Sequence, residues 1–245
     1  FYINGKWVSP VEPRSFEVIN PATEEPCAEI SLGGKKDVDA AVTSAKKAFE
    51  TWGFTTKEER LNLFEKLYEI YKKNWDQMAK TISLEMGAPI DFSTELQTKT
   101  GASHIKSFKN ILKNFKFEKT LDEEKNQTIL YEPKGVCALI TPWNWPINQV
   151  NLKVIPALAA GCTVVLKPSE IAPLSSMLLA EMMHDAGFPK GVFNLVNGDG
   201  AVTGDALTSH PDIDMISFTG STRAGALISQ NAAKDFKRIS LELGG

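Results

Sequence analysis

One stretch decides the fold: residues 135–170 read GVCALITPWNWPINQVNLKVIPALAAGCTVVLKPSE. An apolar run at 136–140 is followed by a helical run at about 147–160, and a second apolar run follows at 163–166. Strands that are apolar throughout and are joined by a helix of about a dozen residues are typical of a parallel sheet with both faces buried. These residues therefore predict one strand–helix–strand unit of such a sheet.

The same alternation continues towards the end of the chain. Strands are predicted at 192–196, 215–218 and 238–241, and helices at 173–186, 201–209 and 222–232. Right-handed crossovers between parallel strands place such helices on both faces of one sheet. The predicted fold class is therefore α/β, with a Rossmann-like parallel sheet, and ligands are expected beyond the carboxyl ends of its strands.

Before residue 118 the chain is predicted to be mostly helical. Apolar residues at helical spacing predict four helices: one at about 38–49, a second that begins after the capping box of Thr56 and Glu59, a third at 75–85 and a fourth at 89–114. Short strands are predicted around 1–8 and 16–19. Within 118–133, a charged stretch separates two segments that can extend as strands, which predicts a projecting hairpin. We expect residues 1–117 and 134–245 to form one discontinuous domain and 118–133 to form an arm.

Composition places the chain among ordinary globular proteins. Of 245 residues, 42% are hydrophobic and 23% are charged, and 27 basic against 30 acidic residues give a net charge of −3. Because the basic residues are scattered among acidic ones, a nucleic-acid partner is not expected. No apolar run approaches the roughly 18 to 20 residues that cross a bilayer, so we expect no membrane partner and a cytoplasmic location.

Cysteines and histidines predict no metal site. Cys27, Cys137 and Cys162 lack C-x-x-C spacing, and the three histidines are far apart in sequence, so neither a disulfide framework nor a zinc site is indicated. The chain begins at Phe1 and stops at Gly245 directly after an apolar strand, which indicates a fragment.

The loop after the first sheet strand runs from Thr141 to Pro146 and contains two prolines. The prolines restrict the backbone and hold the Asn144 side chain in one place. A carboxamide presented in this way can donate a hydrogen bond to a developing oxyanion. The alternative is that Asn144 caps the following helix.

The loop after the second strand reads Lys167-Pro168-Ser169-Glu170. A lysine and a glutamate at a strand end can together hold the vicinal hydroxyls of a ribose, and the glutamate repels a 2′-phosphate. The alternative is a surface ion pair.

The next two loops contain small residues. After the third strand, Gly200 and Gly204 lie in a turn that leads into a helix. These glycines can be explained by the conformational needs of the turn alone. The fourth strand ends in Phe218-Thr219-Gly220-Ser221, with Gly225 one helical turn later, and such residues let backbone N–H groups approach a phosphate. The alternative for this turn is close packing of the helix on the sheet.

The last strand ends in Leu241-Glu242-Leu243-Gly244-Gly245. A glutamate among apolar neighbours is partly desolvated, which favours the role of a general base. The alternative is that Glu242 lies on the polar face of an edge strand.

Together, the four motifs TPWNWP, KPSE, FTGST and LELGG, in this order and spacing, closely resemble the NAD(P)-dependent aldehyde dehydrogenase superfamily. The resemblance covers essentially the whole chain, because Ile3-Asn4-Gly5-Lys6-Trp7 and Asn20-Pro21-Ala22-Thr23 are similar to the N-terminal entry of that family. It implies an NAD-dependent oxidation of an aldehyde to a carboxylic acid through a cysteine thioester, with NADP as a possible second cofactor.

The resemblance also implies roles for individual residues. Asn144 matches the oxyanion donor and Glu242 the base that activates water, which favours the hydrolytic branch over the branch that depends on CoA. The implied cofactor-binding residues are Thr141, Pro142, Trp143, Lys167, Pro168, Ser169, Glu170, Gly200, Gly204, Phe218, Thr219, Gly220, Ser221, Gly225 and Leu243. Residues 118–133 correspond to the oligomerisation arm of relatives, which implies a homo-oligomer, either a dimer or a tetramer.

The family's nucleophilic cysteine lies beyond the LELGG motif, in a catalytic domain that these 245 residues do not include. The positions of Cys27, Cys137 and Cys162 indicate structural thiols. We therefore expect the chain to be the cofactor-binding half and to be inactive without that cysteine. A naturally truncated, non-catalytic nucleotide-binding or oligomerisation module and a CoA- or phosphate-dependent relative stay open as alternatives.

Overall fold

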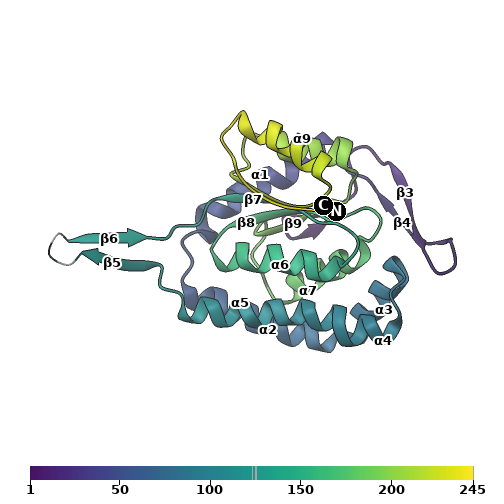
Figure 1. The fold of residues 1–245 in the computed structure, drawn as a ribbon, viewed down its shortest axis with the longest axis horizontal. Helices are drawn as coiled ribbons and strands as arrows, with labels where there is room; N and C mark the ends of the chain where they lie inside the picture. The colour runs from purple at the N-terminus through teal and green to yellow at the C-terminus, as the bar shows by residue number, and fades with distance from the viewer. Residues whose placement is uncertain (123, 125, 245) are drawn as a thin grey trace.

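A seven-stranded sheet forms the centre of the molecule (Figure 1). The structure is a computed structural model that describes residues 1–122, 124 and 126–244. The strands follow one another in space in the order β11-β10-β7-β8-β9-β1-β2. Their bounds are β7 Val136–Ile140, β8 Thr163–Lys167, β9 Phe193–Leu195, β10 Met215–Gly220, β11 Arg238–Leu243, β1 Tyr2–Ile3 and β2 Lys6–Trp7.

The strands from β11 to β9 are parallel, which confirms the predicted α/β class and the five predicted strands. The chain moves from β7 outward to β8 and β9, and then returns to place β10 on the other side of β7. The order of the strands therefore reverses between β7 and β10. In open α/β sheets a ligand crevice lies at this point, outside the carboxyl ends of the strands.

Helices cover both faces of the sheet (Figure 1). One face carries α1 (Lys35–Trp52), α8 (Asp205–Ser209) and α9 (Thr222–Ala233), and the other carries α6 (Pro146–Ala159) and α7 (Leu174–Asp185). A further layer of α2 (Lys57–Lys73), α3 (Trp75–Met86) and α5 (Lys99–Asn114) packs on α6 and α7. The predicted capping box of α2 forms, because Thr56 Oγ1 accepts from the Glu59 N–H.

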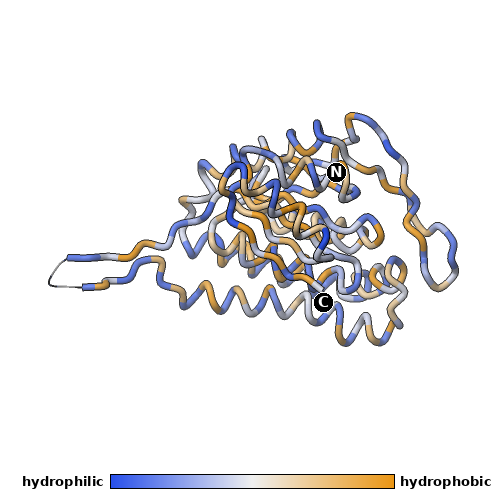
Figure 2. The backbone as a smooth tube through the Cα atoms, turned by 45° about the horizontal axis from the view of Figure 1, so that its top comes forward, coloured by the Kyte–Doolittle hydropathy of each residue, from blue (hydrophilic) through white to orange (hydrophobic). Residues whose placement is uncertain are grey.

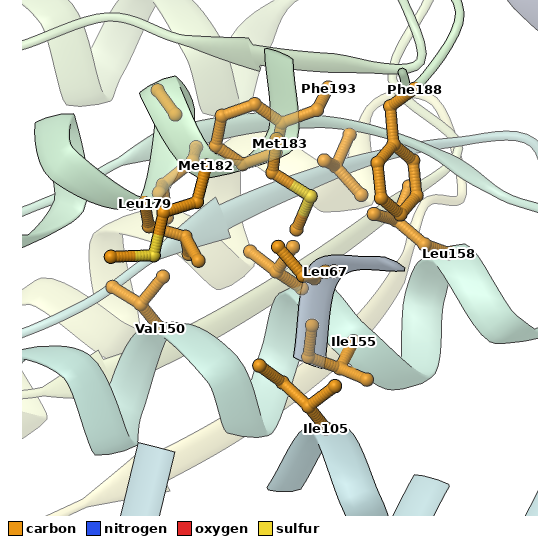
Figure 3. Packing of buried hydrophobic residues seen from close by; sticks show 14 of the residues in the cluster. Leu67, Ile105, Val150, Ile155, Leu158, Leu179, Met182, Met183, Phe188 and Phe193 are labelled. Atoms are coloured by element: carbon orange, nitrogen blue, oxygen red, sulfur yellow. The ribbon is translucent and has the colours of Figure 1, made fainter. Parts of the chain in front are cut away.

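The two hydrophobic cores follow from side-chain alternation along the strands. In β7, Cys137 and Leu139 face the core shared with α6 and α7, whereas Val136 and Ala138 face the core shared with α1. Figure 3 shows the first core, where Leu67, Ile155 and Phe193 come from three different elements. Burying each strand on both faces explains why these runs are apolar throughout.

The predicted long helix at 89–114 is one continuous helical segment. It consists of α4 (Ile90–Phe92), a stretch of π-helix η1 (Ser93–Thr98) and α5. A second π-helical stretch, η2 (Gly200–Gly204), precedes α8. Among the described residues, no helix is both long enough and apolar enough to cross a bilayer.

One strand of the N-terminal part was not predicted. The predicted strand at 16–19 is β3 (Ser15–Asn20), and it pairs antiparallel with β4 (Glu25–Ser31). The β4 segment contains two glutamates and a proline, so its composition does not indicate a strand. It is held by pairing with β3 and by packing of Ile30 beside Val18 in a small core.

A two-stranded hairpin projects from the body (Figure 1). It consists of β5 (Glu118–Asp122) and β6 (Gln127–Leu130), which pair antiparallel, as predicted for 118–133. Glu123 and Lys125 of the predicted charged stretch lie outside the described residues, as does Gly245. Figure 2 shows that hydrophilic residues predominate along the outer part of the hairpin, whereas apolar residues concentrate in the body.

Candidate functional site

A cavity of about 480 Å³ lies at the point where the strand order reverses. Ile140 from the end of β7 and Phe218 from β10 form its floor, and Lys167 from the end of β8 reaches it. Its walls are η2 with the start of α8 and one side of α9, including Arg223. Four of the predicted cofactor residues therefore line one cavity: Lys167, Gly200, Gly204 and Phe218.

Lys167, which lines this cavity, forms an ion pair with Glu170, and its Nζ lies 3.5 Å from a Glu170 carboxylate oxygen. Lys167 is only 4% exposed, and its ammonium also donates to the carbonyls of Gly198 and Pro168. Burial lowers the pKa of Lys167, while Glu170 opposes that effect. The pair is thus half-buried, and backbone carbonyls fix its lysine. This differs from the surface ion pair that the sequence allowed as an alternative.

Pro168 and Ser169, which lie between these two residues, are buried. The Ser169 hydroxyl accepts a hydrogen bond from the Ile171 N–H at 3.3 Å, so it holds the turn of the loop. These two predicted site residues shape the loop that presents Glu170.

The turn after β9 is held by an ion pair that the sequence did not predict. Asp199 caps η2 by accepting from the Val202 N–H at 2.6 Å, and Arg14 donates to Asp199 at 2.8 Å. Burial raises the pKa of Asp199, but these hydrogen bonds and the charge of Arg14 outweigh it and lower the pKa overall. The ionised carboxylate fixes the turn in which Gly200 begins. A Cβ atom on Gly204 would lie 3.9 Å from the Lys167 side chain, so η2 packs directly over that lysine.

The strand-to-helix turn after β10 places Ser221 at the N-cap of α9. Its hydroxyl accepts from the Ala224 N–H at 3.3 Å, so it caps the helix. The first N–H groups of a helix have no partner within the helix, and such a helix end can bind an anion.

The two glycines flanking Ser221 have packing roles. A Cβ on Gly225 would lie 2.7 Å from Leu243, and one on Gly220 would lie 2.4 Å from the Phe218 ring. The structure therefore supports close helix–sheet packing at Gly225, where α9 meets β11, whereas Gly220 makes room for the Phe218 ring of its own strand.

Asn144 is exposed and does not cap α6. The N-cap residue of α6 is Trp145, which makes no side-chain cap hydrogen bond, and Pro146 opens the helix. The alternative that Asn144 serves as a helix cap is therefore wrong. Trp145 packs edge-on against Phe92 at a centroid distance of 5.4 Å, and this contact holds the loop against the helical segment that follows Pro89. Trp143, in contrast, is 49% exposed.

Glu242 lies on β11, opposite Thr219 of β10, and its side chain is exposed. The described residues therefore do not bury the Glu242 carboxylate. β11 is an edge strand of the sheet, which agrees with the alternative that Glu242 lies on the polar face of such a strand. Two strand spacings, about 10 Å, separate β11 from β7, whose end carries Asn144. Asn144 and Glu242 thus lie at one edge of the sheet without direct contact.

Lys153 of α6 is a buried cation beneath this edge that the sequence did not single out. It is 7% exposed, donates to the Ser217 hydroxyl at 3.1 Å and interacts electrostatically with Glu242. Burial lowers its pKa. The signal in the sequence was a lysine within a helix whose other buried residues are mostly apolar.

Buried hydroxyl and amide oxygens at the strand ends have no partner among the described residues. They are Thr141 Oγ1 after β7, Asn197 Oδ1 after β9 and Thr219 Oγ1 in β10. An unsatisfied buried polar atom costs about 1–3 kcal/mol, so these strand ends carry polar atoms that the described residues leave without a hydrogen bond. A cavity with a fixed cation, a carboxylate and a helix N-terminus fits a ligand that carries ribose and phosphate groups.

Among the residues that the structure describes, no three His, Cys, Asp or Glu side chains form a group that could hold a metal ion.

Comparison with known proteins identifies the family. Residues 7–245 match the aldehyde dehydrogenase family. The chain belongs to the aldehyde dehydrogenase family. It is 52% identical over its whole length to a 3-succinoylsemialdehyde-pyridine dehydrogenase of a Pseudomonas species, of which it covers 51%.

Solved aldehyde dehydrogenases have the same fold. The chain superposes on one from Bartonella henselae with a TM-score of 0.98 and 59% identity, covering 100% of this chain and 52% of that one. It superposes on a variant of aldehyde dehydrogenase C from Pseudomonas syringae, complexed with NAD+ and octanal, with a TM-score of 0.97 and 50% identity, covering 100% of this chain and 50% of that one. The chain thus spans about half the length of the aldehyde dehydrogenases that it matches.

Proposed function

We propose that this chain is the NAD-binding half of an aldehyde dehydrogenase that oxidises an aldehyde to a carboxylic acid through a cysteine thioester. The observation that carries the proposal is the 480 Å³ cavity at the reversal of strand order, lined by Lys167, which is ion-paired with Glu170. The Pseudomonas syringae relative, which is complexed with NAD+, supports the choice of cofactor. Bound NAD would supply the hydride acceptor.

The residues of the cavity have distinct roles in this proposal. Lys167 and Glu170 hold the hydroxyls of the adenosine ribose, because a buried ammonium and a carboxylate can donate to and accept from them. The first N–H groups of α9, beyond Ser221, face the diphosphate. Gly200 and Gly204 border the adenine, where side chains would narrow the cavity.

The chemical groups lie at the neighbouring edge of the sheet. Asn144 donates its amide to the oxyanion, and Glu242 activates the water that hydrolyses the thioester. The nucleophilic cysteine is contributed by residues outside these 245. The buried Lys153 interacts electrostatically with Glu242, which opposes the lowering of the Lys153 pKa by burial.

Calorimetric titration of NAD into the protein tests the cofactor site. Lys167→Met removes a charged hydrogen-bond donor, which is worth about 1.5–3 kcal/mol, so the Kd should rise roughly 10- to 150-fold. Lys72→Met is the matched control, because Lys72 forms an exposed pair with Glu69 on α2, in the outer layer of helices on the other face of the sheet. Wild-type affinity in a folded Lys167→Met variant would refute the assignment of the site.

We also propose that the hairpin joins copies of the protein in a homo-oligomer, either a dimer or a tetramer. The described parts of β5 and β6 form a sheet of two strands, and an isolated two-stranded ribbon is marginally stable, so pairing with a strand of another copy would stabilise it. Leu121 and Leu130 of the hairpin are each 62% exposed, so contact with another copy would remove their apolar surface from water.

Light scattering after size-exclusion chromatography tests the role of the hairpin. The variant Leu121→Asp/Leu130→Asp should have a lower mass than the wild type, whereas Val11→Asp, a change at an exposed site in the N-terminal segment, should not. An unchanged mass for the double variant would remove the hairpin from the assembly.

A further inference from the structure

The cofactor cavity contains a polar cluster to which the proposed function gives no role. The cluster consists of Asp205 and Thr208 of α8 and Asn231 of α9, and all three residues line the cavity. The Asn231 Nδ2 donates to Asp205 Oδ1 at 2.9 Å and to the Thr208 hydroxyl at 3.1 Å. These hydrogen bonds join the two helices that form walls of the cavity.

The partners of Asn231 fix the orientation of its amide. A carboxylate only accepts hydrogen bonds, so the NH2 group of Asn231, and not its carbonyl oxygen, faces Asp205. The Thr208 hydroxyl donates to the Gly204 carbonyl at 2.9 Å, so its oxygen accepts from Asn231. Asp205 Oδ1 is therefore held by an amide that is itself held in place.

Two acceptor atoms of the cluster are left over. Among the described residues, no hydrogen bond involves Asp205 Oδ2 or Asn231 Oδ1. Asp205 is also exposed, so a ligand in the cavity can reach its carboxylate. A hydrogen bond to a charged acceptor is stronger than one between neutral groups. The cluster therefore fits a ligand group that donates, such as an amine.

Position along α9 separates this cluster from the phosphate-binding end of the cavity. Ser221 caps α9, and Arg223, which also lines the cavity, lies in its first turn. Asn231 lies ten residues beyond Ser221, about 15 Å along a helix that rises about 1.5 Å per residue. The proposed function places the diphosphate at the first N–H groups of α9, so the cluster lies on the adenine side.

The cavity between these two ends has apolar walls. The apolar residues that line it are Ile140, Phe218, Ala224, Leu227 and Ile228. Leu227 is 57% exposed, so an aromatic ring that covers it removes apolar surface from water. These walls suit the faces of a planar base, and the cluster supplies the acceptors for an amine at its edge.

We propose that Asp205, positioned by Asn231, binds the amino group at C6 of the adenine and so selects NAD over a dinucleotide that carries hypoxanthine. The inference rests on the proposed function, which places the adenine in this cavity. Adenine has an NH2 group at C6, which donates to the carboxylate. Hypoxanthine has a carbonyl oxygen there, so two acceptors would face each other. A site built to bind a donor discriminates against an analogue that lacks it.

Calorimetric titration of NAD and of nicotinamide hypoxanthine dinucleotide into the protein tests the inference. The wild type should bind NAD roughly tenfold more tightly, because the analogue loses a hydrogen bond to a charged group. Equal Kd values for the two dinucleotides would overturn the inference and leave the proposed function standing. Absence of binding by both would overturn the proposed function, and this inference with it.

Two changes at Asp205 distinguish recognition of the base from a structural role. In Asp205→Asn, the carboxamide oxygen keeps the bond from Asn231 and the new NH2 group faces the base, so hypoxanthine should be preferred. In Asp205→Ala, the ratio of the two Kd values should fall to about one, since neither base finds a partner there. A purely structural role would weaken both dinucleotides equally and keep the wild-type ratio, which would overturn the inference.

Asp185→Asn is the matched control. Asp185 is an exposed residue at the end of α7, on the other face of the sheet from α9. The change removes the same charge away from the cavity, so the ratio of Kd values should equal that of the wild type. A control that shifts the ratio as far as Asp205→Ala does would show that net charge sets the preference, and the inference would be wrong.

Discussion

Glu85 provides a direct test of the balance between burial and hydrogen bonding. It lies in α3, is 1% exposed, and accepts from the N–H groups of Leu174 and Ser175 at the start of α7. Burial raises the pKa of this carboxyl from 4.5 to about 7, although both amides act in the opposite direction. The nearby Cys27 has a pKa raised by burial, so it does not titrate between pH 5 and 7.

The sign of the pH effect follows from these values. Since the folded pKa exceeds the unfolded one, the unfolded chain releases the proton first, and stability falls as pH rises from about 4.5 to 7. The gap corresponds to about 3 kcal/mol, with a slope of up to about 1.4 kcal/mol per pH unit. Glu85→Gln resembles the protonated acid and should lack this slope.

Urea denaturation from pH 5 to 8 measures the effect as the difference between wild type and Glu85→Gln, which cancels the other titrating groups. The variant should gain stability relative to the wild type as pH rises, and the difference should level off above about pH 7. Parallel pH profiles would refute the reasoning. They would show that the helix N-terminus keeps Glu85 ionised over the whole range.

Three further changes probe the site and the core. Glu170→Gln removes a negative charge beside Lys167, so the preference for NAD over NADP should fall roughly tenfold, measured as the ratio of calorimetric Kd values. An unchanged ratio would mean that Glu170 does not face the ribose. Gly225→Val places a Cβ 2.7 Å from Leu243 and should cost about 1–3 kcal/mol in urea denaturation, whereas Gly200→Ala, with nothing within 4 Å, should cost much less. Ile155→Ala in the fully buried core should cost about 2–5 kcal/mol, and a loss below 1 kcal/mol would indicate that the core refills the space.

The sheet was predictable because its strands are buried on both faces. Residues 136–140 and 164–166 are apolar throughout, and the structure places them in adjacent parallel strands. β4 was not predictable by the same rule, since its polar sequence is held by pairing rather than by composition. Local patterns thus revealed the elements that carry their own hydrophobic signal.

Contacts between distant residues limited prediction of the site. Turn chemistry drew attention to Lys167, Glu170 and Ser221, because they lie at or shortly after the ends of β8 and β10. Arg14 contacts Asp199 across 185 residues of sequence, and Cys137 lies beside Val164 through the register of β7 and β8. No local spacing records such pairs, so both became visible only in the folded chain.

Burial separates two groups of residues in the proposed site. Lys167, Thr141 and Phe218 are buried, so the chain itself positions the cofactor-facing groups. Asn144 and Glu242 are exposed, and an exposed amide or carboxylate exchanges its hydrogen bonds with water. Oxyanion stabilisation is strong only where water is excluded and donors are fixed. Under the proposed function, residues 1–245 alone should therefore bind NAD but leave aldehydes unoxidised, because the residues that would cover Asn144 and Glu242, like the nucleophile, lie outside this chain.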